Sequence, residues 1–108
     1  MKYAGVYMTM KNKAQARHIG RTLVKEHLAA CVNIIDNMES IYWWNGRMNN
    51  DHEVVMAAKT RMELVNALTS RVKKLHTYEC PCVVAYQITG GNEQYLRWIK
   101  KETKVRKK

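Results

Sequence analysis

The segment Ile41-Tyr42-Trp43-Trp44-Asn45-Gly46-Arg47 lies at the centre of a longer stretch that runs from Cys31 to Thr60. Asn-Gly is the dipeptide that most readily gives both central residues of a type I′ turn a positive φ, and this turn folds two strands back on each other. We therefore interpret the stretch as one hairpin with arms of about thirteen residues each, against a usual strand of about five or six. Such a hairpin must extend beyond the rest of the sheet in a chain of 108 residues.

Three aromatic residues, Tyr42, Trp43 and Trp44, stand next to the predicted turn. Neighbouring side chains of a strand point to opposite faces, so the two tryptophans cannot share one. Large exposed apolar side chains of this kind usually mark an interface. We expect these three residues to contact other copies of the chain; the alternative, in which they fold back onto their own subunit, stays open.

The remaining elements follow from hydrophobic spacing and turn residues. Asn12 and Gln15 predict a capping box at the start of a helix of about sixteen residues, and Thr60 with Glu63 predicts a second box. Asp36-Asn37 predicts a bulge in the first hairpin arm. The pattern gives strands over 3–10, 31–44, 47–59 and 82–89, helices after residues 12 and 60, and a short closing helix from residue 92. This order is α+β and ferredoxin-like, βαββαβ plus a C-terminal helix, in a single domain over 1–103 with a basic tail over 104–108.

Right-handed crossovers place both main helices on one face of the four-stranded antiparallel sheet. The other face should be polar if the protein is a monomer. However, the first strand is apolar on both sides, with Tyr3 and Tyr7 on one and Val6 and Met8 on the other. We therefore expect oligomerisation through the open face and the long hairpin.

The chain is strongly basic, with 19 Lys and Arg against 9 Asp and Glu and a net charge of +10. The bases are scattered except in the C-terminal tail, which predicts a solvated surface, and we do not expect nucleic acid as a partner. The three cysteines are odd in number, and Cys80 and Cys82 are too close in sequence for an unstrained bridge. Free thiols indicate a reducing compartment. Because no apolar leader or membrane span is visible, we expect a cytoplasmic protein with no membrane partner.

No catalytic motif is present, and we expect the protein not to be an enzyme. The thiols of Cys31 and of Cys80-Pro81-Cys82, together with His76, are ligand types that suit copper or zinc. The alternative for the cysteines is simple packing, because a free cysteine is commonly a small buried hydrophobe.

Several motifs resemble the CutA, divalent-cation-tolerance family over about residues 3–103. They are Ala29-Ala30-Cys31-Val32-Asn33, Tyr42-Trp43-Trp44-Asn45-Gly46, Glu53-Val54 with Lys59-Thr60, His76-Thr77-Tyr78-Glu79-Cys80-Pro81 and Tyr95-Leu96-Arg97-Trp98-Ile99. The resemblance implies a homotrimer of ferredoxin-like subunits whose hairpins pair around a threefold axis. It also implies a role in tolerance of copper and other divalent ions.

Some members of that family carry a cysteine where this chain has Met8, and a His-His pair where it has Leu75-His76. From the resemblance we expect a metal site in the clefts between subunits, with His76 as the imidazole ligand and Cys31 and Glu79 as its partners. Copper or another divalent cation is the expected ion, not tightly bound. The alternative is a small-molecule or partner-sensing module with an anion cleft. Its residues would be Lys59, Tyr78, Tyr95 and Trp98.

Overall fold

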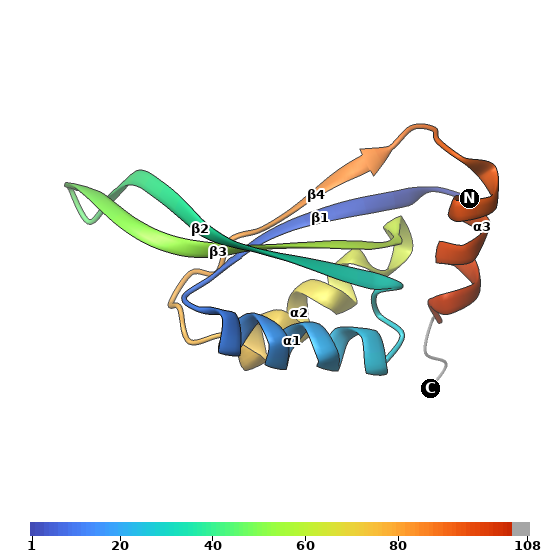
Figure 1. Ribbon diagram of the computed structural model, residues 1–108, viewed down its shortest axis with the longest axis horizontal. Helices are drawn as coiled ribbons and strands as arrows, with labels where there is room; N and C mark the ends of the chain where they lie inside the picture. The colour runs from blue at the N-terminus through green and yellow to red at the C-terminus, as the bar shows by residue number, and fades with distance from the viewer. Residues whose placement is uncertain (105–108) are drawn as a thin grey trace.

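The computed structural model describes residues 1–104 of the chain (Figure 1). Its elements, in order, are β1 (Tyr3–Met10), α1 (Lys13–Lys25), β2 (Cys31–Trp44), β3 (Arg47–Arg61), the 3₁₀ turn η1 (Met62–Leu64), α2 (Val65–Leu75), β4 (Val83–Ile88) and α3 (Glu93–Glu102). The strands form one antiparallel sheet in the order β2-β3-β1-β4. The predicted ferredoxin-like α+β fold is confirmed. The predicted basic tail lies, apart from Lys104, outside the described residues.

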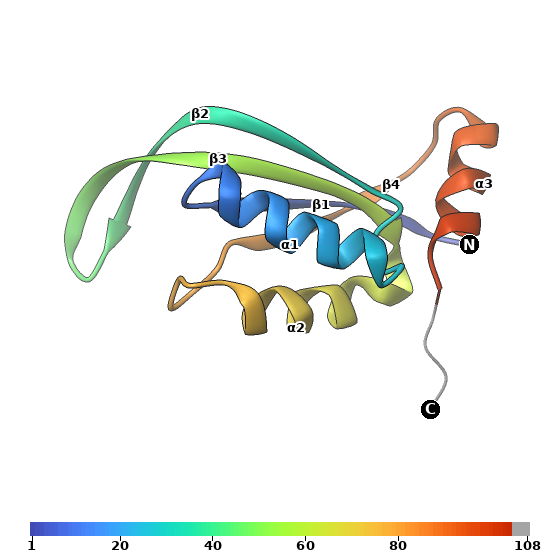
Figure 2. The same cartoon turned by 60° about the horizontal axis from the view of Figure 1, so that its bottom comes forward.

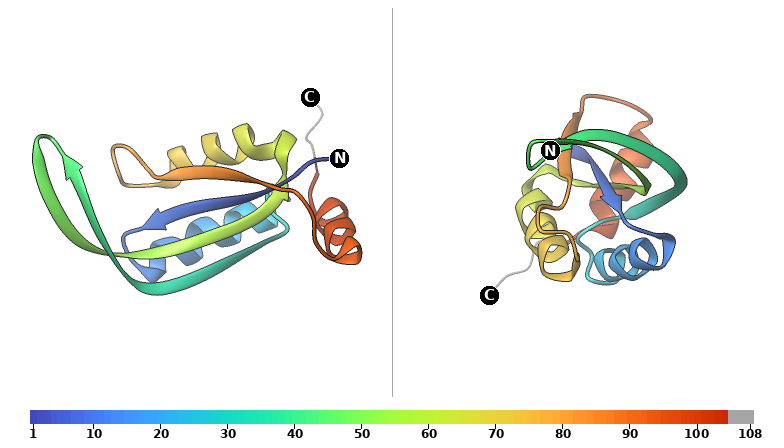
Figure 3. Two further views of the ribbon diagram at one scale, coloured as in Figure 1. Left: turned by 90° about the horizontal axis from the view of Figure 1, so that it is seen from above. Right: turned by 90° about the vertical axis from the view of Figure 1, so that its left-hand side faces the viewer.

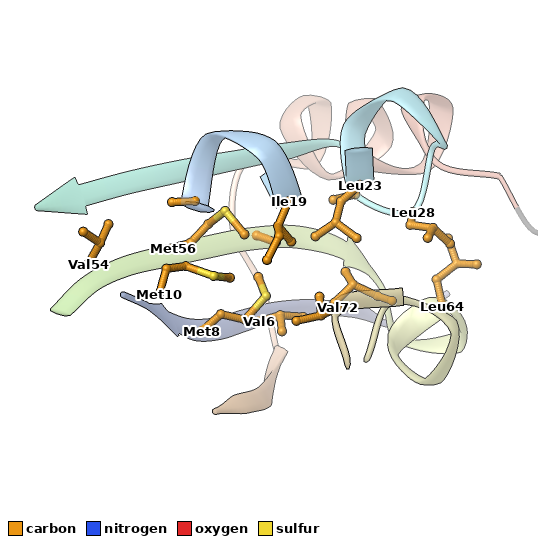
Figure 4. Packing of buried hydrophobic residues seen from close by; sticks show 14 residues of the cluster. Val6, Met8, Met10, Ile19, Leu23, Leu28, Val54, Met56, Leu64 and Val72 are labelled. Carbon is orange, nitrogen blue, oxygen red and sulfur yellow. The ribbon is translucent and has the colours of Figure 1, made fainter. Parts of the chain in front are cut away.

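Helices α1 and α2 lie side by side on one face of the sheet (Figures 1 and 2). Alternate residues of β1 and β3 point into this layer and are fully buried, among them Met8 and Met56. They pack against Ile19 and Leu23 of α1 in one continuous apolar cluster (Figure 4). The apolar residues that alternate along the strands and those at helical spacing in α1 therefore form one core.

The hairpin of β2 and β3 has the turn that the sequence predicts. Asn45 has a φ of 51° and Gly46 a φ of 75°, as a type I′ turn requires. The pairing register slips between Ile35 and Met38, and Asn37 has a φ of 68°, so the predicted bulge is confirmed. Beyond this bulge the hairpin curves away and extends past both helices (Figures 1 and 3).

The two predicted capping boxes have different outcomes. Asn12 caps α1, accepting from the Gln15 amide at 2.8 Å, although the helix has 13 residues and not about sixteen. The box at Thr60 is wrong. Thr60 is the buried penultimate residue of β3, and its hydroxyl donates to the Leu28 carbonyl at 2.6 Å. The Thr60 hydroxyl is therefore engaged in a tertiary hydrogen bond and does not cap the following helix.

Helix α3 stands at the end of the sheet opposite the hairpin tip, close to the N-terminus (Figure 1). The guanidinium of Arg61 holds it there, donating to the Thr103 hydroxyl at 2.8 Å and to the Lys100 carbonyl at 2.7 Å. Asn92 caps its first turn by accepting from the Gln94 amide at 3.0 Å. These contacts fix the side chains of α3 relative to the ends of β2 and β3.

The sheet face opposite α1 and α2 stays largely uncovered in the single chain (Figure 3). Tyr86 on this face is 61% exposed, and Val84 is exposed beside it. The expectation of an apolar face that the chain's own main helices do not cover is confirmed. None of the helices within residues 1–104 has the length and the apolar run that a membrane span needs.

Candidate functional site

His76 follows α2 directly and is buried against the end of β1. Its Nδ1 accepts from the Tyr78 amide at 3.0 Å, so Nε2 carries the proton and donates to the Thr9 carbonyl at 2.9 Å. Both ring nitrogens are therefore engaged, and a metal ion must displace one of these partners to bind the imidazole.

Cys31 and Glu79, the partners expected for His76, do not meet it in one chain. Cys31 begins β2 and lies opposite Lys59, whereas His76 contacts Thr9, which lies opposite Val55. Lys59 and Val55 are four positions apart on β3, which is about 13 Å at the usual rise of a strand. Glu79 is exposed in the loop after His76. Among residues 1–104, no three His, Cys, Asp or Glu side chains gather as a metal site would require.

Three of the four residues expected to line an anion cleft come together at the α3 end of the sheet. Tyr95 and Trp98 lie on one side of α3 with their ring centroids 5.3 Å apart, and the Lys59 ammonium lies 6.0 Å from the Tyr95 ring centroid. Cys31 joins this group, with its Sγ 3.6 Å from the Tyr95 hydroxyl and 3.9 Å from Lys59 Nζ. The Cys31 hydrogen bond, and then burial, raises the pKa of Tyr95.

Asn33 also belongs to this group, although it was not among the predicted site residues. Its Oδ1 accepts from Lys59 Nζ at 2.9 Å. Asn33 lies two residues after Cys31, and residues two apart in a strand share a sheet face, so the sequence could have predicted that Asn33 lies beside Cys31. Elsewhere, a recess of about 410 Å³ lies along α1 between Arg17, Arg21 and Lys25, away from this group.

Tyr78, the fourth residue of the expected cleft, lies at the other end of the sheet. Its hydroxyl donates to Glu53 at 2.9 Å. Burial, and then the Glu53 hydrogen bond, raises the pKa of Tyr78. Next along the hairpin, the Tyr42 hydroxyl donates to Asp51. Tyr78 therefore belongs to a row of phenol–carboxylate pairs along the hairpin and not to the Lys59 group.

All three residues predicted to form a subunit interface are exposed at the hairpin tip. Trp43 is 72% exposed and pairs across the hairpin with Met48. Ile41 lies on the same face, and both Ile41 and Met48 are exposed. Tyr42 and Trp44 lie on the opposite face. Ile41 and Met48 were not among the predicted interface residues, and they enlarge the apolar surface.

Comparisons with known proteins agree on the family. The family model for the CutA1 divalent ion tolerance protein matches residues 4–102. A rice protein named CutA 1, chloroplastic, is 44% identical over 99 residues, covering 92% of this chain and 56% of the rice protein. The divalent-cation tolerance protein CutA of Thermus thermophilus is 42% identical over 98 residues, covering 91% and 95% of the two chains.

Solved structures of the same family share the fold of this chain. The crystal structure of CutA1 from Oryza sativa superposes with a TM-score of 0.93 at 42% identity, covering 96% of this chain and 95% of that one. This chain spans just over half the length of the rice and human relatives but nearly all of the Thermus one. The chain belongs to the CutA1 divalent ion tolerance family.

Proposed function

We propose that this protein is a homotrimeric, non-enzymatic cytoplasmic protein of divalent-cation tolerance that binds metal ions, copper among them, in clefts between subunits. The observation that supports this most strongly is the apolar surface that one chain leaves uncovered. The hairpin tip exposes Trp43, Ile41 and Met48, and the open face exposes Tyr86. Burial of such area on a second copy is favourable by about 25 cal/mol for each Å².

Native mass spectrometry of the purified protein tests the assembly. We expect a mass of three chains for the wild type, and smaller species for Trp43→Asp, which places a charge in the proposed interface. Arg47→Asp, at the same tip, is a charge-changing control outside the apolar set. A wild-type protein that stays monomeric at micromolar concentration contradicts the proposal.

Metal binding in this proposal needs more than one subunit. His76, Cys31 and Glu79 supply an imidazole, a thiol and a carboxylate, a donor set that suits copper or zinc. In one chain Cys31 lies about 13 Å along the strand direction from the position of His76. The three side chains can share an ion only if they come from different copies. Weak binding is expected, because His76 must also give up the Tyr78 amide or the Thr9 carbonyl.

Calorimetric titration of the reduced protein with Cu(I), Cu(II) and Zn(II) tests the ligands one by one. We expect His76→Ala and Cys31→Ser each to weaken binding of the preferred ion by at least about tenfold, the effect of about 1.4 kcal/mol. His18→Ala, on the exposed face of α1, is the matched histidine control. Unchanged affinity in His76→Ala removes His76 from the site.

A second candidate function rests on the group of Lys59, Tyr95 and Trp98. An ammonium beside aromatic rings is suited to a small anion with an apolar part, and these three residues gather within one chain. A retained anion found at this group in protein purified without metal favours a ligand-sensing module. Loss of that anion in Lys59→Met, with the trimer mass unchanged, would assign it to the Lys59 ammonium.

A further inference from the structure

The Cys31 thiol has an amine as its close neighbour. Lys59 Nζ lies 3.9 Å from Cys31 Sγ, and the two residues are direct cross-strand partners at the base of the hairpin. Lys59 is held in this position, because its Nζ also donates to Asn33 Oδ1 at 2.9 Å. The Tyr95 hydroxyl lies 3.6 Å from the same sulfur on the other side. Cys31 is half-buried, so a small oxidant has access to it.

No second thiol of the same chain can reach Cys31. Cys31 is on β2, at one edge of the sheet, and Cys80 and Cys82 precede β4, at the opposite edge. Three strand spacings separate the edges, about 14 Å, whereas disulfide-bonded cysteines have Cα atoms within about 7 Å. An oxidised Cys31 therefore has no intrachain disulfide partner. The Lys59 amine, which is a stronger nucleophile than the neighbouring Tyr95 hydroxyl, lies 3.9 Å from its sulfur.

We propose that Cys31 and Lys59 form a reversible sulfur–nitrogen cross-link, a sulfenamide, when the protein meets hydrogen peroxide. In the first step the Cys31 sulfur attacks one peroxide oxygen, the O–O bond breaks, and sulfenic acid and water result. In the second step the Lys59 amine, having lost its ammonium proton to solvent, attacks this sulfur. The S–N bond forms, the S–O bond breaks, and the departing hydroxide takes a proton from the nitrogen to leave as water. One thiol, one amine and one peroxide thus give one sulfenamide and two waters, with sulfur oxidised and peroxide reduced.

Two features of the site favour this product over further oxidation of the sulfur. Sulfenic acids are known to condense with a nearby backbone nitrogen, and here a side-chain nitrogen lies at contact distance. The cross-link also joins residues that the β2–β3 ladder already holds side by side, so little chain entropy is lost in forming it. It would fasten the base of the hairpin covalently and shield Cys31 from irreversible oxidation.

The test is mass spectrometry of the assembled full-length protein, with Cys80→Ser and Cys82→Ser to remove competing thiols. After brief exposure to hydrogen peroxide we expect each chain to lose the mass of two hydrogens. Peptide mapping should then find the Cys31 and Lys59 peptides joined, and a thiol reductant should separate them. The same mapping on the unsubstituted protein gives the answer independently if the serine variant folds poorly.

Lys59→Arg is the matched variant, because arginine keeps the positive charge but its guanidinium is a poor nucleophile. We expect complete loss of the cross-link in this variant, and accumulation of Cys31 sulfenic acid that dimedone labels. Three outcomes overturn the proposal: wild-type Cys31 that proceeds to sulfinic acid with Lys59 unmodified, a disulfide between Cys31 residues of two copies, or the same two-hydrogen loss in Lys59→Arg.

Discussion

The β2–β3 hairpin has two halves that differ in where their side chains go. At its base, residues 54–61 of β3 alternate strictly between buried and half-buried, whereas from Arg47 to His52 most side chains are exposed. The backbone ladder continues through both halves, interrupted only by the bulge. Strand pairing alone therefore does not distinguish them; the difference is the helix layer, which covers the base and ends before the tip. A single chain therefore leaves the apolar residues of the tip exposed.

Two methionines of β3 test this contrast directly, and the first gives the largest expected effect. Met56 is fully buried, whereas Met48 is 68% exposed. We expect Met56→Ala to lower the free energy of unfolding by about 2–5 kcal/mol, through lost contacts and the cavity left behind. Met48→Ala should change it by no more than about 0.5 kcal/mol in a dissociated chain. Urea unfolding followed by circular dichroism measures both.

Protein concentration sharpens the same comparison. If copies cover the tip, the cost of Met48→Ala should grow with protein concentration, since dissociation and unfolding are then linked. The cost of Met56→Ala should stay large at every concentration. A Met48→Ala cost as large as that of Met56→Ala in dilute, dissociated protein would show that the tip has a core of its own, and the contrast would fail.

A smaller effect is expected where α1 meets the base of the hairpin. A Cβ added to Gly20 would lie 2.8 Å from Val32 Cγ2 and 3.0 Å from Met56 Sδ. Alanine favours a helix by about 1 kcal/mol over glycine, but overpacking costs about 1–3 kcal/mol. We therefore expect Gly20→Ala to destabilise the protein by about 1 kcal/mol in thermal unfolding.

Gly5→Ala is the matched control on the uncovered face. A Cβ there meets no atom within 4 Å, and alanine lowers the entropy of the unfolded chain, so no loss of stability is expected in a dissociated chain. A Gly20→Ala protein that is as stable as Gly5→Ala would mean that α1 packs less closely than described. A Gly5→Ala loss that appears only in concentrated protein would locate a neighbouring copy against Gly5.

Local signals in the sequence predicted the hairpin well. Asn45-Gly46 and Asp36-Asn37 act through their own backbone preferences, so the turn and the bulge are readable without tertiary structure. The capping box predicted at Thr60 was wrong because the Thr60 hydroxyl donates to the carbonyl of Leu28, which is distant in sequence. The sequence placed Tyr78 with Lys59, but the register puts them at opposite ends of the sheet. Contacts that depend on register or on a distant partner are not encoded by local spacing.

A further expected effect lies at the boundary between base and tip, where Tyr78 donates to Glu53. Glu53 is paired with Met38, directly after the bulge. Burial, and then Glu53, raises the pKa of Tyr78 above its ordinary value of 10.0. Because the pKa is higher in the folded state, the stabilisation is complete below pH 10 and is lost as pH rises through the folded pKa.

Tyr78→Phe removes the phenol hydroxyl, and with it both the hydrogen bond to Glu53 and the group that titrates. We expect it to cost about 1 kcal/mol at neutral pH, and the difference from wild type to shrink as pH rises above 10, where the wild type loses its advantage. Tyr86→Phe on the uncovered face is the control. The Tyr86 hydroxyl has no hydrogen-bond partner among residues 1–104, so this change should alter neutral-pH stability by less than about 0.5 kcal/mol. A Tyr78→Phe difference that stays constant across this pH range would contradict the raised pKa. The hydroxyl of Tyr78 would then be solvated, and the covered half of the hairpin would have to end before the bulge and not after it.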